Sequence, residues 1–188
     1  MNWLTEIEIS FLNSLQEILK CDFLDRFFTG ITHLGDAGII WILIAVVCLF
    51  FKKTRKTGIC MGMALVMGLI FGNLILKNVI ARERPYTYEL ACMTAEKVKE
   101  LISLPSDYSF PSGHTQASFA AATSIFMYSK KYGTLAYILA ALIAFSRMYL
   151  YVHFPTDILG GILLGIIYGI VSFYLIKRFA PRFEKKIS

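Results

Sequence analysis

The chain has 188 residues, 56% of them hydrophobic, and a mean hydropathy of +0.60. This apolar share exceeds that of ordinary soluble domains and predicts a single all-α integral membrane domain over residues 1–188. The formal net charge is +6. Its basic residues are divided among separate loops rather than gathered on one face, which argues against a nucleic-acid-binding protein.

The first 30 residues differ from the rest of the chain. Between residues 3 and 28, Leu4, Ile7 and Phe11 begin an apolar repeat at helical spacing, while acidic residues such as Glu6 and Glu8 interrupt any continuous apolar run. This pattern predicts an amphipathic helix that lies at the membrane interface. A sixth crossing helix and a solvated helix packed on the domain remain alternatives.

Five apolar stretches approach the roughly 20 residues that a helix needs to cross a bilayer. They cover about 35–51, 58–80, 113–128, 132–145 and 158–176. The predicted architecture is therefore five transmembrane helices after an N-terminal interfacial helix. The core covers residues 31–176, and a basic tail covers residues 177–188.

The basic residues predict how this domain is oriented. Eleven of the nineteen lie after the first, third and fifth stretches, together with a single acid, Glu184: Lys52, Lys53, Arg55, Lys56, Lys130, Lys131, Lys177, Arg178, Arg182, Lys185 and Lys186. The positive-inside rule assigns these segments and the C-terminus to the cytoplasm. The N-terminus, the 81–112 loop and the 146–157 turn then face outward from the cell membrane.

Small residues and cysteines add two weaker predictions. Gly161, Gly165 and Gly169 repeat every four residues in the fifth stretch, a spacing that lets helices approach closely within the bundle or across a homodimer. Cys21 and Cys92 both fall on the oxidising side, where they could form a disulfide.

Polar residues from five separate segments converge on the outer membrane face. They are Lys77, Arg84, Ser112 to His114, Arg147, and His153 with Asp157. Such residues are expensive at helix ends in a membrane and usually serve a site. A phosphate group needs several converging donors of this kind, so the pattern predicts a phosphate site.

The helix start and the cationic residues of this set can each bind a phosphate group. A helix that starts at Ser112 and Gly113 points free N–H groups at an anion, although Ser112 could simply cap the helix. Arg84 and Arg147 suit bidentate contacts with phosphate oxygens. Lys77 adds a point charge, or else extends to the headgroups like other lysines at helix ends. By contrast, Arg82 is interpreted as an interface anchor.

The histidines predict hydrolytic chemistry. Asp157 can fix one nitrogen of the His153 ring and leave the other free to attack phosphorus, while His114 can protonate the departing oxygen. His33 is interpreted as an interfacial or capping residue and Asp36 as an N-cap. No metal or other cofactor is expected, because the matched residues lack metal-ligand spacing.

At these residues the chain resembles the type 2 phosphatidic acid phosphatase (PAP2) family. Three motifs carry the resemblance: Lys77 with Arg84-Pro85, Pro111 to His114, and Ser146-Arg147 with His153 and Asp157. The resemblance implies metal-independent hydrolysis of a membrane lipid phosphate through a phosphohistidine. It implies His153 as nucleophile, Asp157 as its orienting carboxylate and His114 as acid. The phosphate ligands would be Lys77, Arg84, Ser112, Gly113 and Arg147.

The resemblance leaves the substrate and the acceptor open. Undecaprenyl diphosphate, phosphatidylglycerophosphate and phosphatidic acid are all candidate substrates. A phosphotransferase would use the same residues, with another acceptor in place of water. A noncatalytic anion-binding protein is a further alternative, although binding alone would not need His153 paired with Asp157.

Overall fold

The structure is a computed structural model that describes residues 3–88 and 101–187, with side chains described as far as residue 179. All regular elements in the described part are helical. The first half contains α1 (Trp3–Leu19), α2 (Asp22–Leu34), the 3-10 helix η1 (Asp36–Gly38), α3 (Ile39–Phe50), α4 (Arg55–Met67), the π-helix η2 (Gly68–Leu76) and α5 (Lys77–Ile80). The second half contains the 3-10 helix η3 (Pro85–Thr87), α7 (Gly113–Tyr128), α8 (Lys130–Tyr149) and α9 (Pro155–Ile187).

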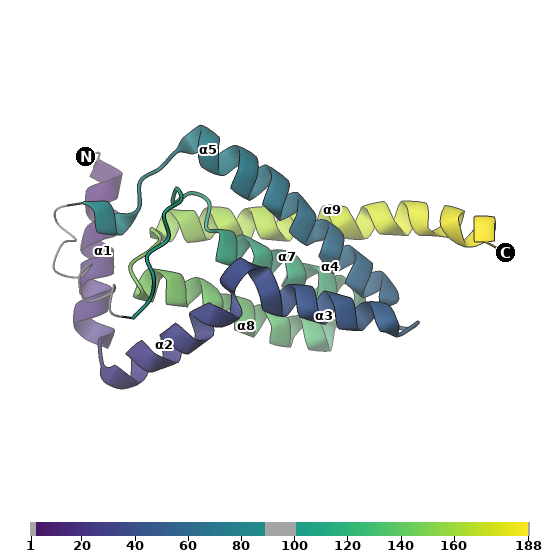
Figure 1. Cartoon of the computed structure of the whole chain (residues 1–188), viewed down its shortest axis with the longest axis horizontal. Helices are drawn as coiled ribbons and strands as arrows, with labels where there is room; N and C mark the ends of the chain where they lie inside the picture. Colours follow the sequence, from purple (N-terminus) through teal and green to yellow (C-terminus); the bar gives the residue numbers. More distant parts are fainter. Residues whose placement is uncertain (1–2, 89–100, 188) are drawn as a thin grey trace.

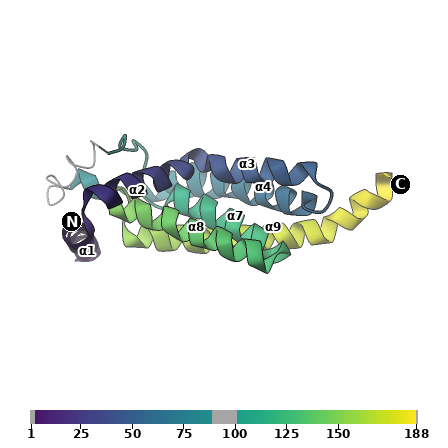
Figure 2. The same cartoon turned by 90° about the horizontal axis from the view of Figure 1, so that it is seen from below.

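The long helices form an elongated bundle with different structures at its two ends (Figure 1). Helices α3, α4, α7, α8 and α9 run along the long axis, and α9 extends beyond the others at one end. At the opposite end α1 lies across the bundle, which is clear from its end-on appearance in Figure 2. The turns between α3 and α4 and between α7 and α8 both lie at the end away from α1, and these turns carry basic residues.

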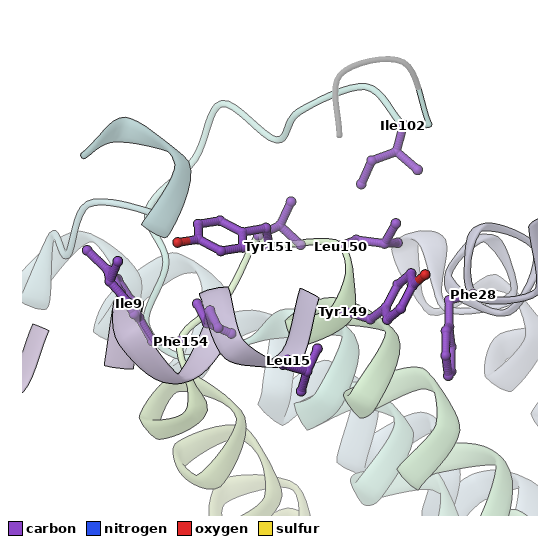
Figure 3. Packing of buried hydrophobic residues seen from close by; sticks show 10 residues of the cluster. Ile9, Leu15, Phe28, Ile102, Tyr149, Leu150, Tyr151 and Phe154 are labelled. Carbon is purple, nitrogen blue, oxygen red and sulfur yellow. The ribbon is translucent and has the colours of Figure 1, made fainter. Parts of the chain in front are cut away.

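Helix α1 covers the turn between α8 and α9. Figure 3 shows Ile9 and Leu15 of α1 against Leu150, Tyr151 and Phe154 of this turn, and all of these side chains are buried. A different face of α1, which includes the Leu4, Ile7 and Phe11 repeat, stays exposed. The helix thus packs on the domain and still presents an apolar stripe outward.

The N-terminal segment consists of two helices where one was expected. The chain extends at Cys21, whose φ and ψ are −156° and 156°, before α2 begins at Asp22. Acidic residues in the first turn of α2, Asp22 and Asp25, favour a helix start at this point. Cys21 is exposed, whereas Cys92 lies outside the described residues, so the proposed disulfide stays a prediction.

Two segments near the end covered by α1 depart from α-helical geometry. Helices α2 and α3 meet at 42° across η1, where Ala37 and Gly38 both have positive φ angles of 50° and 68°. The second segment is η2, whose π-helical winding places Lys77 at the start of α5. Irregular winding of this kind is frequent at functional sites because it redirects side chains.

The helices agree in part with the predicted spans. In the described chain, three segments are long and apolar enough to cross a membrane: 55–87, Lys130–Tyr149 and Pro155–Phe179. The bent pair of α2 with η1 and α3 could supply a fourth. The remaining predicted span coincides with α7, which has only 16 residues.

Helix α7 is the centre of the bundle. It packs against α8, α9 and α4, and its residues from Thr115 to Ile125 are largely buried. Close packing with α9 depends on glycine: a Cβ atom on Gly165 would lie 2.6 Å from the Gln116 carbonyl oxygen. Gly161 and Gly169 also face α7. These three glycines therefore pack within the bundle.

Candidate active site

A cavity of about 680 Å³ extends from the N-terminal end of α7 along the bundle. Its polar end is lined by side chains from all three sequence motifs: Lys77, Arg84, His114, Arg147 and His153. The rest is apolar and formed by α3 with α4 and η2, including Ile42, Val46, Leu49, Leu65, Val66 and Leu69. Chain folding thus brings the predicted cations and histidines together at one end of an apolar space.

Lys77 and Arg84 share one carboxylate. The Lys77 ammonium contacts Oδ2 of Asp107, and Nη2 of Arg84 donates to Oδ1 of Asp107 at 2.6 Å. Both cationic side chains are buried, whereas the Asp107 side chain is 53% exposed. Burial alone would raise the pKa of Asp107, but the hydrogen bond and charge of Lys77, with the charge of Arg84, lower it to about 2.

Arg147 is the least satisfied cation of the site. It is 3% exposed, and its Nη1 donates to Oγ1 of Thr32 at 2.5 Å. Its Nε is buried and has no hydrogen-bond partner in the described part of the chain. A buried donor without a partner is costly, so the position favours an anionic ligand that would accept from it.

His153 lies in the turn before α9 and is 1% exposed. Its Nε2 lies 3.2 Å from Nη1 of Arg84. Because a guanidinium can only donate, Nε2 must carry the lone pair, and the ring proton of the neutral form belongs on Nδ1. Burial and the positive charges of Arg84, Arg147 and Lys77 keep the pKa of His153 well below its ordinary value. The ring is therefore neutral near neutral pH, with an unprotonated Nε2.

Asp157 and Ser109 flank the other nitrogen of His153. Oδ2 of Asp157 lies 3.5 Å from Nδ1, and Oγ of Ser109 lies 3.4 Å from it. Ser109 also donates to the same Asp157 oxygen at 2.5 Å, and the backbone N–H of Phe154 donates to it at 2.8 Å. Pro155 begins α9, which puts Asp157 in the first helical turn, as expected.

Arg82 is part of this network, so its interpretation as an interface anchor is wrong. Its Nη1 donates to Oδ1 of Asp157 at 2.7 Å, and its guanidinium lies 4.0 Å from the centroid of the Phe154 ring. Its Nη2 pairs with Glu8 at 2.5 Å, and Glu8 in turn accepts from the N–H and hydroxyl of Thr156. The cover helix α1 therefore contributes a buried carboxylate to the support of Asp157.

His114 contacts a carboxylate that had been interpreted as a helix cap. Its Nε2 lies 2.9 Å from Oδ1 of Asp36, and the other carboxylate oxygen lies 2.8 Å from Nδ1 of His33. Gly35 is the cap residue before η1, so Asp36 is not an N-cap. His33, which is exposed, has Asp36 as its partner.

Ser112 and Gly113 stand at the start of α7, as the second motif predicts. Ser112 makes no capping hydrogen bond with its side chain, and its hydroxyl instead accepts from Thr115 at 3.0 Å. A Cβ atom on Gly113 would lie 3.0 Å from Oδ1 of Asn73, so glycine fits tightly against η2. The amide oxygen of Asn73 is itself buried and unpaired among the described residues.

Besides Arg82 and Thr32, four polar residues around the site were missed as contributors: Glu8, Asp36, Asp107 and Ser109. The first two come from elements outside the motifs. Asp107 and Ser109 directly precede the second motif, and this closeness in sequence was the only available signal. None of the four belongs to a spacing pattern, so their contribution depends on contacts that form only in the folded chain.

Residues 56–181 match the family model described as PAP2 superfamily. The chain belongs to the PAP2 superfamily. This membership confirms the resemblance carried by the three motifs. The match covers most of the chain and includes every predicted site residue.

Individual relatives are phosphatases. Undecaprenyl-diphosphatase of Sulfolobus acidocaldarius is 35% identical over 127 residues, which are 67% of this chain and 58% of that protein. Phosphatidylglycerophosphatase B of Bacillus subtilis is 32% identical, with 89% of this chain and 81% of that protein covered. Among solved structures, Aquifex aeolicus LpxE superposes with a TM-score of 0.73 at 27% identity, covering 89% of this chain and 95% of that one.

Proposed function

We propose that this chain is an integral membrane phosphatase that hydrolyses a lipid phosphate or diphosphate through a phosphohistidine on His153. The observation that carries the proposal is the surplus of buried positive charge at the polar end of the apolar cavity. Lys77, Arg84 and Arg147 are each less than a tenth exposed. Among the described residues, the half-exposed carboxylate of Asp107 contacts Lys77 and Arg84, whereas Arg147 donates to the neutral hydroxyl of Thr32. Buried charges need partners, and a phosphate would supply the missing negative charge.

The shape of the cavity supports a lipid as the substrate. Cations and histidines line one part of the cavity, and apolar residues of α3 and α4 line the rest together with η2. A phosphate on a long hydrocarbon chain matches both parts. The relatives named as undecaprenyl-diphosphatase and phosphatidylglycerophosphatase B favour these two substrate classes, and phosphatidic acid is the third candidate.

The proposed reaction has two steps. Nε2 of His153 attacks phosphorus while the cations stabilise the oxygens of the transferring group, and His114 gives a proton to the departing lipid oxygen. His114 then takes a proton from water, which attacks the phosphohistidine and releases inorganic phosphate. Asp157 holds the Nδ1 side of His153 and stabilises the imidazolium form.

The proposed topology has five crossings. The bent pair α2 and α3 forms the first, the segment from α4 to α5 the second, and α7, α8 and α9 the others. Helix α1 lies at the interface, with its exposed Leu4, Ile7 and Phe11 stripe toward lipid. The basic turns lie at the end away from the site, which favours an outward-facing site and a cytoplasmic C-terminus.

The decisive experiment is phosphate release by the purified protein from a panel of undecaprenyl diphosphate, phosphatidylglycerophosphate and phosphatidic acid. We expect at least one lipid to be hydrolysed without an added acceptor, in the presence of a chelator, with inhibition by vanadate. His153→Ala should reduce kcat by about 10³-fold or more, whereas Asp22→Ala, an exposed position on α2, should not. Release that requires an acceptor lipid would indicate a phosphotransferase, and binding without turnover would indicate a noncatalytic protein.

A further inference from the structure

The break between α2 and α3 is built around His114. A Cβ atom on Gly35 would lie 2.7 Å from Cδ2 of the His114 ring. Any residue larger than glycine at this position would therefore clash with His114. The next residues, Ala37 and Gly38, have positive φ angles and turn the chain into α3. Asp36 lies between these positions, and its Oδ1 is 2.9 Å from Nε2 of His114.

The contact between Asp36 and His114 parallels that between Asp157 and His153. In each case a carboxylate faces one ring nitrogen and leaves the second nitrogen for chemistry. The Asp36 carboxylate is itself held from the other side by His33 at 2.8 Å. His114 is 19% exposed and lines the cavity with His153, whereas Asp36 is 47% exposed.

The charges around His114 explain why it needs a carboxylate. Lys77 on α5, Arg147 on α8 and Arg84 line the same cavity, and the charges of Arg147 and Lys77 oppose a positive charge on the His114 ring. Asp36 is the acidic residue that contacts the ring. A histidine that must carry a proton to a leaving oxygen beside three cations therefore depends on this carboxylate for both charge and orientation.

We propose that Asp36 is the positioning residue of the acid–base histidine, holding His114 through Nε2 so that Nδ1 exchanges the proton with the leaving oxygen and then with water. This inference rests on the proposed function. Proton balance is kept within the ring: Nδ1 loses a proton as the bond from phosphorus to the leaving oxygen breaks, and it regains one from the attacking water.

The test compares two substrates of nearly the same shape, p-nitrobenzyl phosphate and p-nitrophenyl phosphate. The benzyl alkoxide needs protonation as it leaves, whereas nitrophenolate leaves without it. We expect Asp36→Asn to lower kcat/KM about 10²-fold for the benzyl ester and less than about tenfold for the phenyl ester. The quantity kcat/KM is chosen because it reports the steps up to phosphoryl transfer to His153.

A second pair of variants tests the same contact without removing the carboxylate. Gly35→Ala should displace the His114 ring and show the same preference for the better leaving group, whereas Gly30→Ala, on α2 with open space around its Cβ, should not. If Asp36→Asn and Gly35→Ala lowered kcat/KM equally for both esters while the unmodified protein was active, the positioning role of Asp36 would be overturned and the proposed function would stand. Failure of the unmodified protein to hydrolyse lipid phosphates or either ester would overturn the proposed function, and this inference with it.

Discussion

At the scale of single residues, the site is defined by how its charges are paired. Arg82 is neutralised by Glu8 and Asp157, whereas Arg147 keeps a buried Nε without a partner in the described part of the chain. Lys77 and Arg84 are intermediate, because their shared carboxylate on Asp107 is half exposed. The paired arginine supports Asp157, and the incompletely paired cations are the ones placed to receive an anion.

Asp107 therefore competes with any phosphate for the same donors. Asp107→Asn should lower the inhibition constant of vanadate or inorganic phosphate about tenfold, because a charge-assisted contact of roughly 1.5–3 kcal/mol no longer has to be displaced. The matched control is Glu83→Gln, which removes an exposed carboxylate from the same loop. Competitive inhibition measured on both variants checks this, and an unchanged constant in Asp107→Asn would show that phosphate binds without displacing Asp107.

At the scale of elements, α1 and α7 contribute to the candidate site in different ways. Helix α1 buries Glu8 together with Ile9, Leu12 and Leu15 against the turn that carries His153. Helix α7 is packed on several sides and begins at the second motif. The candidate site thus lies between the helix that packs on the α8–α9 turn and the central helix that carries His114.

Loss of the Glu8 carboxylate should loosen the cover helix α1. Glu8→Ala removes the partner of Arg82 and the acceptor for Thr156, which should cost about 2 kcal/mol and lower Tm by about 4–8 °C. Glu6→Ala removes an exposed carboxylate from the same helix and should leave Tm unchanged. Thermal unfolding in detergent compares the two, and equal melting temperatures would mean that α1 does not restrain the turn.

The contact between α7 and α9 makes a second prediction at this scale. Gly165→Ala should destabilise the protein by about 1–3 kcal/mol, because the new Cβ would lie 2.6 Å from a backbone oxygen of α7. In Gly62→Ala the same change in α4 meets nothing within 4 Å and should be neutral or stabilising through helix propensity. Unfolding curves of the two variants give the comparison, and similar effects would contradict close packing at Gly165.

At the scale of the whole molecule, the two ends of the bundle differ in chemistry. The site and the cover helix occupy one end, while the basic turns and the C-terminal part of α9 occupy the other. This separation follows the long axis, along which the long helices α7, α8 and α9 run. In a membrane, the two ends would therefore face different compartments.

Sidedness can be measured by cysteine labelling in intact cells. With Cys21 and Cys92 replaced by serine, Ser103→Cys at the site end should react with an impermeant thiol reagent, whereas Lys53→Cys in the α3–α4 turn should not. Both positions are exposed in the structure. The reverse pattern would place the site in the cytoplasm and restrict its substrates to lipids of the inner leaflet.

The sequence by itself determined the family, the apolar segments and the residues of the candidate site that the three motifs contain. Hydropathy depends on local composition, and the three motifs keep their spacing along the chain, so both are readable without a fold. Lys77, Arg84, His114, Arg147, His153 and Asp157 were all identified in this way, and the structure brings them to one end of the bundle.

Only the tertiary structure decided how these residues are supported. His114 meets Asp36 across 78 positions of the chain, and Arg82 meets Glu8 across 74. The sequence around a single carboxylate does not identify its partner. The partner depends on which cation or imidazole the folded helices bring within hydrogen-bond distance. The same holds for the kink before α3, where Gly35 packs against the distant ring of His114.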